Sequence, residues 1–407
     1  MIDALASRGI VFDSLFTTSS TTLPAHTSLM TGRNPGDLRN GTTLTDSVLT
    51  LAEVLSREGY ETRAVVSSVP LDEGFNLDQG FDFYDSDFSA CRGTIRSRDG
   101  TYYARPFGVF DCNASETTQR VLGAIADADH SRPNLLWVHY FDPHFPYQPP
   151  ERFYDASRVT RRRFPFFHRA TKADVTSLNE LYDGEVRFVD EQLAKLFEGL
   201  EERGFLENAL ILLVSDHGEN LYQHDGYLDH SKVVYETVMK IPALLVLPDG
   251  TASRLGQLAS ITDLMPTLLD LIGVEMPQEG AADFIAGRSL LPMIDAGHTA
   301  DEIREFVACE TNDYGLAKQD QTVAIRSQEF KLILNNWNKG GRTFFDLSED
   351  PQERRPRAEL PSDGEAELEG YHQTWISQPA GPPMVKSIEL DESTRRGLKS
   401  LGYLRDG

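Results

Sequence analysis

Short apolar runs alternate with amphipathic segments along most of the chain. Apolar runs of strand length predict strands at residues 64–69, 134–140, 209–215 and 241–247. Apolar positions that recur every three or four residues predict helices at residues 47–57, 176–203 and 261–272. Because the strands are continuously apolar and are separated by helices, the pattern predicts an α/β fold with a mainly parallel central sheet and helices on both faces.

The pattern changes beyond about Pro292. Short β-rich segments separated by turn residues predict an antiparallel meander at residues 306–310, 322–326, 330–335 and 343–346. The charged stretch 348–378 is expected to wrap over the surface. We therefore expect a large domain at residues 1–295 and a small C-terminal antiparallel sheet subdomain, of α+β type with a tail, at residues 296–407.

The composition is that of a globular protein. The 407 residues are 40% hydrophobic and 25% charged, and the formal net charge is -24. Such an acidic chain is a poor candidate for binding nucleic acid or for a polybasic membrane anchor. No apolar run reaches the roughly 18 residues that cross a bilayer, and the N-terminus lacks a charged-then-apolar signal pattern. We expect a soluble protein without a transmembrane segment.

The three cysteines, Cys91, Cys112 and Cys309, form no Cys-x-x-Cys pair, so a thiolate zinc site is not supported. Cys91 and Cys112 stand 21 positions apart, which permits a disulfide and equally permits two reduced thiols. The segment between them belongs to the stretch 81–110, whose Asp, Arg and aromatic residues are typical of an insertion or an irregular loop at an active site.

Polar side chains directly follow two of the predicted strands. Asp216 and His217 come after the strand at 209–215, and His144 follows the strand at 134–140. Ligands of parallel sheets bind at the carboxyl ends of strands, and a carboxylate beside an imidazole suits a divalent cation. The alternative is that Asp216 only caps a helix.

Hydroxyl side chains crowd the segment before Pro24, which can open a helix. A hydroxyl at a helix N-terminus lies beside free N–H groups that suit an oxyanion. It is therefore placed to attack a phosphate or sulfate ester. The alternative is a capping turn rich in Ser and Thr.

Taken in order, these segments resemble the sulfatase family of the alkaline phosphatase superfamily. The family signature reads Cys or Ser, any residue, Pro, any residue, Arg, and then Thr-Gly-Arg. Here the same spacing holds Thr22, Pro24, His26 and Thr31-Gly32-Arg33. The resemblance continues over nearly the whole chain in the segments at 137–147, 181–190, 214–219, 230–242, 262–269, 287–290, 345–351 and 398–404.

The resemblance implies roles for particular residues. Thr22 stands at the nucleophile position and contributes to the metal site, whose other matching ligands are Asp216 and His217. Since Thr cannot become the formylglycine of true sulfatases, Thr22 points to phosphoesters. His26 replaces the Arg that helps to hold the nucleophile. The remaining implied residues are His144 and His230 on the substrate side, Lys232 as a partner for developing negative charge, and Asn40 as a further substrate contact.

The resemblance also places an apolar strand that ends in metal-binding Asp residues ahead of a segment like residues 1–12. The chain begins inside that segment, so we expect the first central strand, its Asp ligands and any signal region to lie outside this sequence. We expect weak or absent activity from the chain as given, and its compartment stays unassigned.

The function implied is that of a metal-dependent hydrolase of sulfate or phosphate esters, with Ca²⁺, Mn²⁺, Zn²⁺ or Mg²⁺ as the cofactor. One alternative is a phospho-group hydrolase or transferase that acts on glycan or lipid phosphoesters. Another is a non-catalytic relative that binds anions in the same cleft. The run Arg161-Arg162-Arg163 either is a solvated face or contacts an anionic sugar of the substrate.

Overall fold

The structure is a computed structural model. It describes residues 1–35, 42–89, 91, 94–96, 102–104, 111–160, 170–276, 286–295, 304–311, 321–336, 340–377, 385–387, 392 and 394–395. Asn40 and the run Arg161 to Arg163 therefore lie outside the described residues.

One of the two larger sheets in the main body has mixed strand directions. Its strands follow the order β11-β1-β10-β9. They are β1 (Ile10–Phe12), β9 (Ile211–Val214), β10 (Ala243–Val246) and β11 (Ser253–Leu255). β1 and β11 are parallel, whereas β10 runs antiparallel to both β1 and β9. The long connection between β9 and β10 lets the chain turn back before β10 begins, which local periodicity did not predict.

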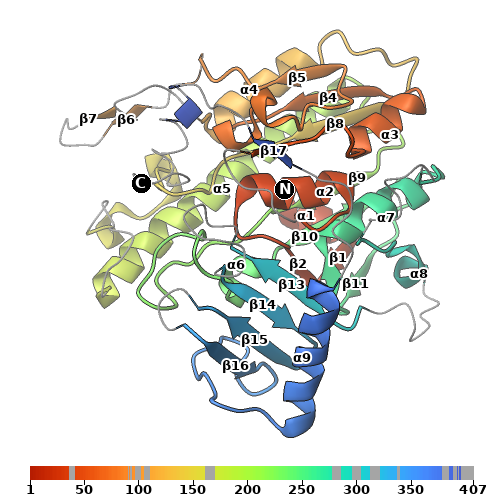
Figure 1. Cartoon of the computed structure of the whole chain (residues 1–407). Helices are drawn as coiled ribbons and strands as arrows, with labels where there is room; N and C mark the ends of the chain where they lie inside the picture. Colours follow the sequence, from red (N-terminus) through yellow and green to blue (C-terminus); the bar gives the residue numbers. More distant parts are fainter. Residues whose placement is uncertain are drawn as a thin grey trace.

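The second large sheet is fully parallel, with the order β5-β4-β8. Its strands are β4 (Glu61–Val65), β5 (Phe83–Asp85) and β8 (Asn134–Val138). Alternate residues of β8 enter different cores: Leu135 and Trp137 pack with one group of helices, and Leu136 and Val138 pack with another. The fold-class prediction of a sheet covered on both faces is confirmed (Figure 1).

Helices α2 (Thr22–Thr31), α3 (Leu51–Arg57) and α7 (Leu264–Leu271) supply the core on one face. Helices α4 (Ala114–Ala124) and α5 (Lys172–Glu202) cover the other face. The remaining helices of the main body are α1 (Ile2–Ala6), α6 (Glu236–Met239) and α8 (Leu291–Ile294). Both α3 and α5 begin with a capping box, at Thr50 and Thr171. As a result α3 begins later than its apolar periodicity predicted, and α5 begins earlier.

Strands β8 and β9 are edge strands among the described residues, because β8 pairs only with β4 and β9 only with β10. Every residue of both strands is partly exposed, although both are almost wholly apolar. The same part of the chain packs against both strands. Leu206 belongs to the hydrophobic clusters of both, Leu196 and Leu200 of α5 belong to that of β8, and Phe197 of α5 belongs to that of β9.

The C-terminal meander is confirmed. Strands β13 (Val307–Glu310), β14 (Val323–Arg326), β15 (Phe330–Leu334) and β16 (Arg342–Asp346) pair antiparallel in sequence order. The expectation of a surface tail at 348–378 is wrong in one part, since residues Ser362–Ile376 form the helix α9. Leu368, Tyr371 and Trp375 pack this helix onto the sheet, at the bottom of the view in Figure 1.

Smaller strand pairs complete the fold. They are β2 (Leu15–Phe16) with β12 (Ala259–Ser260), β3 (Thr42–Leu44) with β17 (Val385–Ser387), and β6 (Thr94–Arg96) with β7 (Tyr102–Ala104). None of the described helices combines the length and apolar character that crossing a membrane requires.

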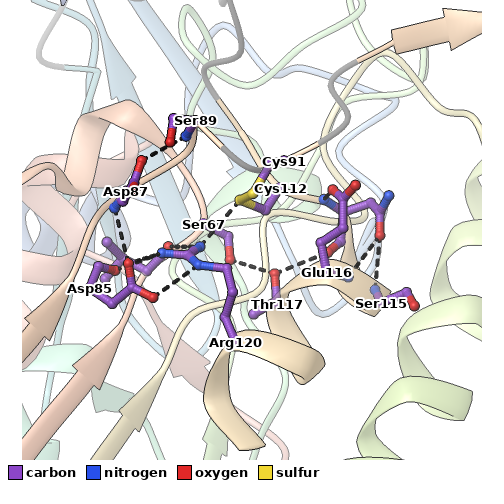
Figure 2. Close-up of a disulfide and its surroundings, with 12 residues drawn as sticks. Ser67, Asp85, Asp87, Ser89, Cys91, Cys112, Ser115, Glu116, Thr117 and Arg120 are labelled. Carbon is purple, nitrogen blue, oxygen red and sulfur yellow. Dashed lines mark hydrogen bonds and ion pairs between the residues drawn. A yellow bond between two sulfur atoms is a disulfide. The ribbon is translucent and has the colours of Figure 1, made fainter. Parts of the chain in front are cut away.

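Cys91 and Cys112 form a disulfide, which decides between the two alternatives left open by the sequence. Figure 2 shows the bridge beside Arg120, which reaches from α4 to the end of β5. The Arg120 guanidinium pairs with Asp85 at 2.6 Å and contacts Sγ of Cys112 at 3.2 Å. Through Arg120 the disulfide is thus linked to Asp85, the last residue of β5.

Candidate active site

Thr22 is the first residue of α2 and is 2% exposed. Thr21, at the N-cap, has an extended backbone, and Gly32 ends the helix in the left-handed conformation with φ 64°. All residues of α2 are buried, so its position in the molecule is closely defined. The structure thus places a hydroxyl side chain at a helix N-terminus, as the sequence predicted.

The Thr22 side chain meets His217, which follows β9. Its Oγ1 lies 3.3 Å from Nε2 of His217. Nδ1 of His217 lies 2.9 Å from the carbonyl oxygen of Gly218. Because a carbonyl can only accept, Nδ1 donates to Gly218, and in the neutral ring Nε2 is then an acceptor. This Nε2 lies within 3.3 Å of both the Thr22 hydroxyl and the Asp216 carboxylate.

The turn that carries Asp216 and His217 is held by Gly218. The Gly218 N–H donates to the Val238 carbonyl at 2.7 Å. A Cβ at position 218 would lie 2.2 Å from the carbonyl oxygen of Thr237, so only glycine fits here. This close approach fixes the turn against α6 and sets the distance between His217 and Thr22.

Asp216 lies among imidazoles. Its Oδ2 is 3.3 Å from Nε2 of His217 and 3.5 Å from Nδ1 of His26. Burial acts to raise the pKa of Asp216, but attraction to the surrounding histidines, His217 foremost, outweighs it and lowers the pKa to about 2. Asp216 is therefore ionised at neutral pH.

His26 lies one turn along α2 from Thr22. Its Nδ1 donates to the Thr22 carbonyl at 2.9 Å. Its ring meets His139 edge-on at 5.0 Å. Burial lowers the pKa of His26, and lowers that of His139 to about 3. Both rings are neutral, so His26 holds the helix end without supplying the charge of the arginine it replaces.

His144 and His230 come together as expected. Their Nε2 atoms are 3.2 Å apart, and the His230 ring stacks on His217 at 3.9 Å. Burial lowers the pKa of His144 to about 3 and holds the pKa of His230 well below its usual value. The structure thus gathers Thr22, His26, Asp216, His217, His144 and His230 in one cluster.

Three further polar residues near these segments, Asp142, His224 and Lys232, lie outside this cluster or at its rim. Asp142 accepts from the Ala114 N–H at the start of α4 at 2.5 Å, and burial raises its pKa to about 7. His224 stacks on Tyr235 at 4.0 Å. Lys232 is partly buried two residues after His230, and its role as a substrate contact stays a prediction.

The sequence assigned no role to three residues beside the cluster: His139, Glu219 and Asp229. Glu219 ends the segment 214–219 that resembles the family, and Asp229 directly precedes His230. The proximity of Asp229 to Glu219 depends on backbone turns with positive φ at Tyr222, Asp225 and Asp229, which no motif signals.

Comparison with known proteins points to one family. The family model described as "Sulfatase" matches residues 1–274, and one described as the C-terminal part of N-sulphoglucosamine sulphohydrolase matches residues 223–364. The chain is 25% identical over 409 residues to the choline-sulfatase of Rhizobium meliloti (strain 1021), which covers 88% of this chain and 77% of that protein. It is 30% identical over 216 residues to the multifunctional alkaline phosphatase superfamily protein PehA of Trinickia caryophylli. That alignment covers 47% of this chain and 40% of PehA.

Solved structures with the same fold include two enzymes. One is described as a complex with its substrate D-glucosamine-2-N,6-O-disulfate; it matches with a TM-score of 0.73 at 20% identity, over 93% of this chain and 92% of that chain. The other is the phosphonate monoester hydrolase of Agrobacterium radiobacter, with a TM-score of 0.70 at 20% identity, over 93% of this chain and 90% of that chain.

Proposed function

The chain belongs to the sulfatase family, and on that premise we propose that it is a metal-dependent hydrolase that cleaves a phosphate or sulfate ester with Thr22 as its nucleophile. The observation that carries the proposal is the contact of Thr22 Oγ1 with Nε2 of His217 at 3.3 Å, beside the ionised Asp216. A hydroxyl at a helix N-terminus, an imidazole acceptor and a carboxylate are arranged here for attack on an anionic ester.

The donor set fits a divalent cation. Asp216 offers an ionised carboxylate, His217 offers an unprotonated Nε2, and Thr22 offers its oxygen. Oxygen and nitrogen donors of this kind suit Zn²⁺, Mn²⁺, Mg²⁺ or Ca²⁺. Asp216, His217 and Thr22 would hold the ion, which when bound lowers the pKa of the hydroxyl.

The reaction follows from the positions of the side chains. The Thr22 hydroxyl gives its proton to solvent, its oxygen forms a bond to phosphorus or sulfur, and the bond to the leaving alcohol breaks. His144 and His230 line the site as the substrate-side residues. An anionic ester beside them raises the pKa of the His144 imidazole and makes it a donor to the leaving oxygen. Water then cleaves the ester of Thr22 and restores the hydroxyl.

Threonine favours phosphorus over sulfur at this position. A sulfate ester of threonine has no formylglycine hydrate through which to eliminate sulfate, whereas a phosphothreonine is open to attack by water. The relatives with described substrates act on choline sulfate, a disulfated glucosamine and phosphonate monoesters, going by their names. We therefore propose a small anionic ester, of a sugar or a related alcohol, as the substrate class.

Parallel assays test this proposal. The protein is incubated with Mn²⁺, Zn²⁺, Mg²⁺ or Ca²⁺ and with p-nitrophenyl sulfate, bis-p-nitrophenyl phosphate or p-nitrophenyl phenylphosphonate. In keeping with the weak activity expected of the chain as given, we expect slow release of p-nitrophenol, and from a phosphorus ester in preference to the sulfate. Thr22→Ala should abolish turnover, Thr22→Ser should keep part of it, and Thr21→Ala, which removes the neighbouring hydroxyl, should keep most of it.

Two results would count against the proposal. If Thr22→Ala retains the turnover of the unaltered chain, Thr22 is not the nucleophile. If the unaltered chain binds these esters and cleaves none of them, the cleft is that of a non-catalytic anion-binding protein.

A further inference from the structure

A second set of potential ligands lies beside His217, on the loop that follows it. Glu219, Asp229 and His230 each bring one donor atom to a place where all three atoms lie within 4.8 Å of one another. His230 is 2% exposed, and the two carboxylates are partly buried. None of the three belongs to the set formed by Asp216, His217 and Thr22.

The imidazole of His230 is fixed in the form that binds a metal ion. Its Nδ1 lies 2.5 Å from the carbonyl oxygen of Ser20, so Nδ1 carries the proton and Nε2 keeps its lone pair. Nδ1 of His144 lies 2.6 Å from the carbonyl oxygen of Phe145, which leaves its Nε2 as an acceptor in the same way. The two acceptor atoms face each other at 3.2 Å, an arrangement that a positive charge between them stabilises.

The carboxylates complete the set. Oδ1 of Asp229 lies 3.4 Å from Nε2 of His230. Oε1 of Glu219 is buried and accepts a hydrogen bond from none of the described residues. Two carboxylates held this close repel each other, and a buried oxygen without a donor costs free energy. A cation bound by both removes the two costs together.

The backbone supports the same conclusion. Asp229 has φ 110°, a conformation that residues other than glycine rarely adopt. The Asp229 N–H donates to the Asn220 carbonyl at 3.2 Å, and the Ser231 N–H donates to Oδ1 of Asp229 at 3.1 Å. These contacts hold the strained residue so that its carboxylate stays beside His230.

We propose that Glu219, Asp229 and His230 bind a second divalent cation, of the class that takes mixed carboxylate and imidazole ligands, such as Zn²⁺ or Mn²⁺. The site is separate from the one formed by Asp216, His217 and Thr22, and it stands whether or not the chain cleaves an ester. It supplies positive charge next to His144, His217 and His230.

The test measures binding of the metal alone. The full chain, freed of metal by a chelator, is titrated with Mn²⁺ and with Zn²⁺ by calorimetry, and Co²⁺ is followed by its visible absorption. The variants are Glu219→Gln, Asp229→Asn and Asp216→Asn. Glu198→Gln, at an exposed position on α5, removes the same charge as Glu219→Gln and serves as the matched control.

We expect Glu219→Gln and Asp229→Asn each to lose one binding event that Asp216→Asn and Glu198→Gln retain. The melting temperature gives a second reading. Glu219→Gln should melt no lower than the unaltered chain without metal, because it takes away a carboxyl group whose ionisation is disfavoured beside Asp229. It should lose the rise in melting temperature that the second metal equivalent causes.

The proposal is overturned if Glu219→Gln and Asp229→Asn fold and bind the same number of ions with the same affinity as the unaltered chain. The proposal is also overturned if metal binding is lost only in Asp216→Asn. Loss only in Glu219→Gln and Asp229→Asn supports this second site and counts against the first, so the two proposals fail separately.

Discussion

The side-chain oxygen of Thr22 lies 3.3 Å from Nε2 of His217, although the two residues are 195 positions apart in the chain. The contact joins the first turn of α2 to the loop that follows β9. It therefore depends on how both elements are held, and residues outside the contact decide whether it forms.

Gly218 is the first such residue. A Cβ there would meet the Thr237 carbonyl oxygen at 2.2 Å, so Gly218→Ala must displace the turn that carries His217. We expect a loss of stability of about 1–3 kcal/mol, as in other overpacked sites, together with weaker metal binding. Urea unfolding and metal titration measure both effects. Gly256→Ala is the control, because no atom lies within 4 Å of a Cβ at that position; equal behaviour of the two variants would contradict the prediction.

The buried histidines make stability depend on pH. Burial lowers the pKa of His26, His139 and His230, so these rings stay neutral in the folded chain while the unfolded chain binds protons below about pH 6.5. Stability is thus fully present above pH 6.5 and falls as the pH decreases below it, by about 1.4 kcal/mol per pH unit for each neutral ring.

Urea unfolding in the presence of a chelator at pH 7.5 and 5.5 measures this slope. His139→Asn should reduce it, since the Asn oxygen can replace Nδ1 of His139, which accepts from the Ser67 N–H at 3.3 Å. A free energy of unfolding that stays constant between the two pH values would show that the rings are protonated in the fold.

Lys331 joins the C-terminal sheet to the main body. Its fully buried Nζ lies 2.6 Å from Oε1 of Glu353 and 3.2 Å from Oε1 of Glu236 at the start of α6. Lys331→Met leaves the buried Glu353 without its cation, although Glu236 keeps Arg326 at 3.3 Å, so we expect a loss of about 3–5 kcal/mol in the free energy of unfolding. Adding Glu353→Gln should restore part of the loss. A double variant no more stable than Lys331→Met would contradict the argument.

The disulfide should contribute through the loop that it closes. Cys91 and Cys112 are separated by 21 positions, for which chain entropy gives about 3 kcal/mol. We expect Cys91→Ser with Cys112→Ser to lower the melting temperature, and the unaltered chain in a reducing agent to melt at the same temperature as this double variant. A melting temperature insensitive to both changes would show that the bridge constrains nothing.

The sequence predicted most of what depends on local pattern. The meander from β13 to β16 was predictable because each strand pairs with the next one along the chain. Thr22, Asp216, His217 and His144 were predictable because each stands where a helix begins or after an apolar strand ends, whereas His230 came only from the resemblance to the family.

What the sequence did not show depends on long-range geometry. The direction of β10 is set by the path of residues 215–242, and an apolar strand reads the same in both directions. Helix α9 has few apolar residues, and only packing of Leu368 and its neighbours on the sheet distinguishes it from a charged tail. Asp229 reaches Glu219 through backbone turns that carry no motif.

The open edges of β8 and β9 have a consequence for hydrogen exchange. Successive residues of a strand direct their N–H groups to opposite edges, so every second amide of each strand bonds to β4 or β10 and the others have no strand partner in the described chain. The unpaired amides should take up deuterium quickly, next to slowly exchanging neighbours. Since His139 and Asp216 lie one and two residues beyond the ends of these strands, deuterium uptake there would report how firmly the active site is anchored.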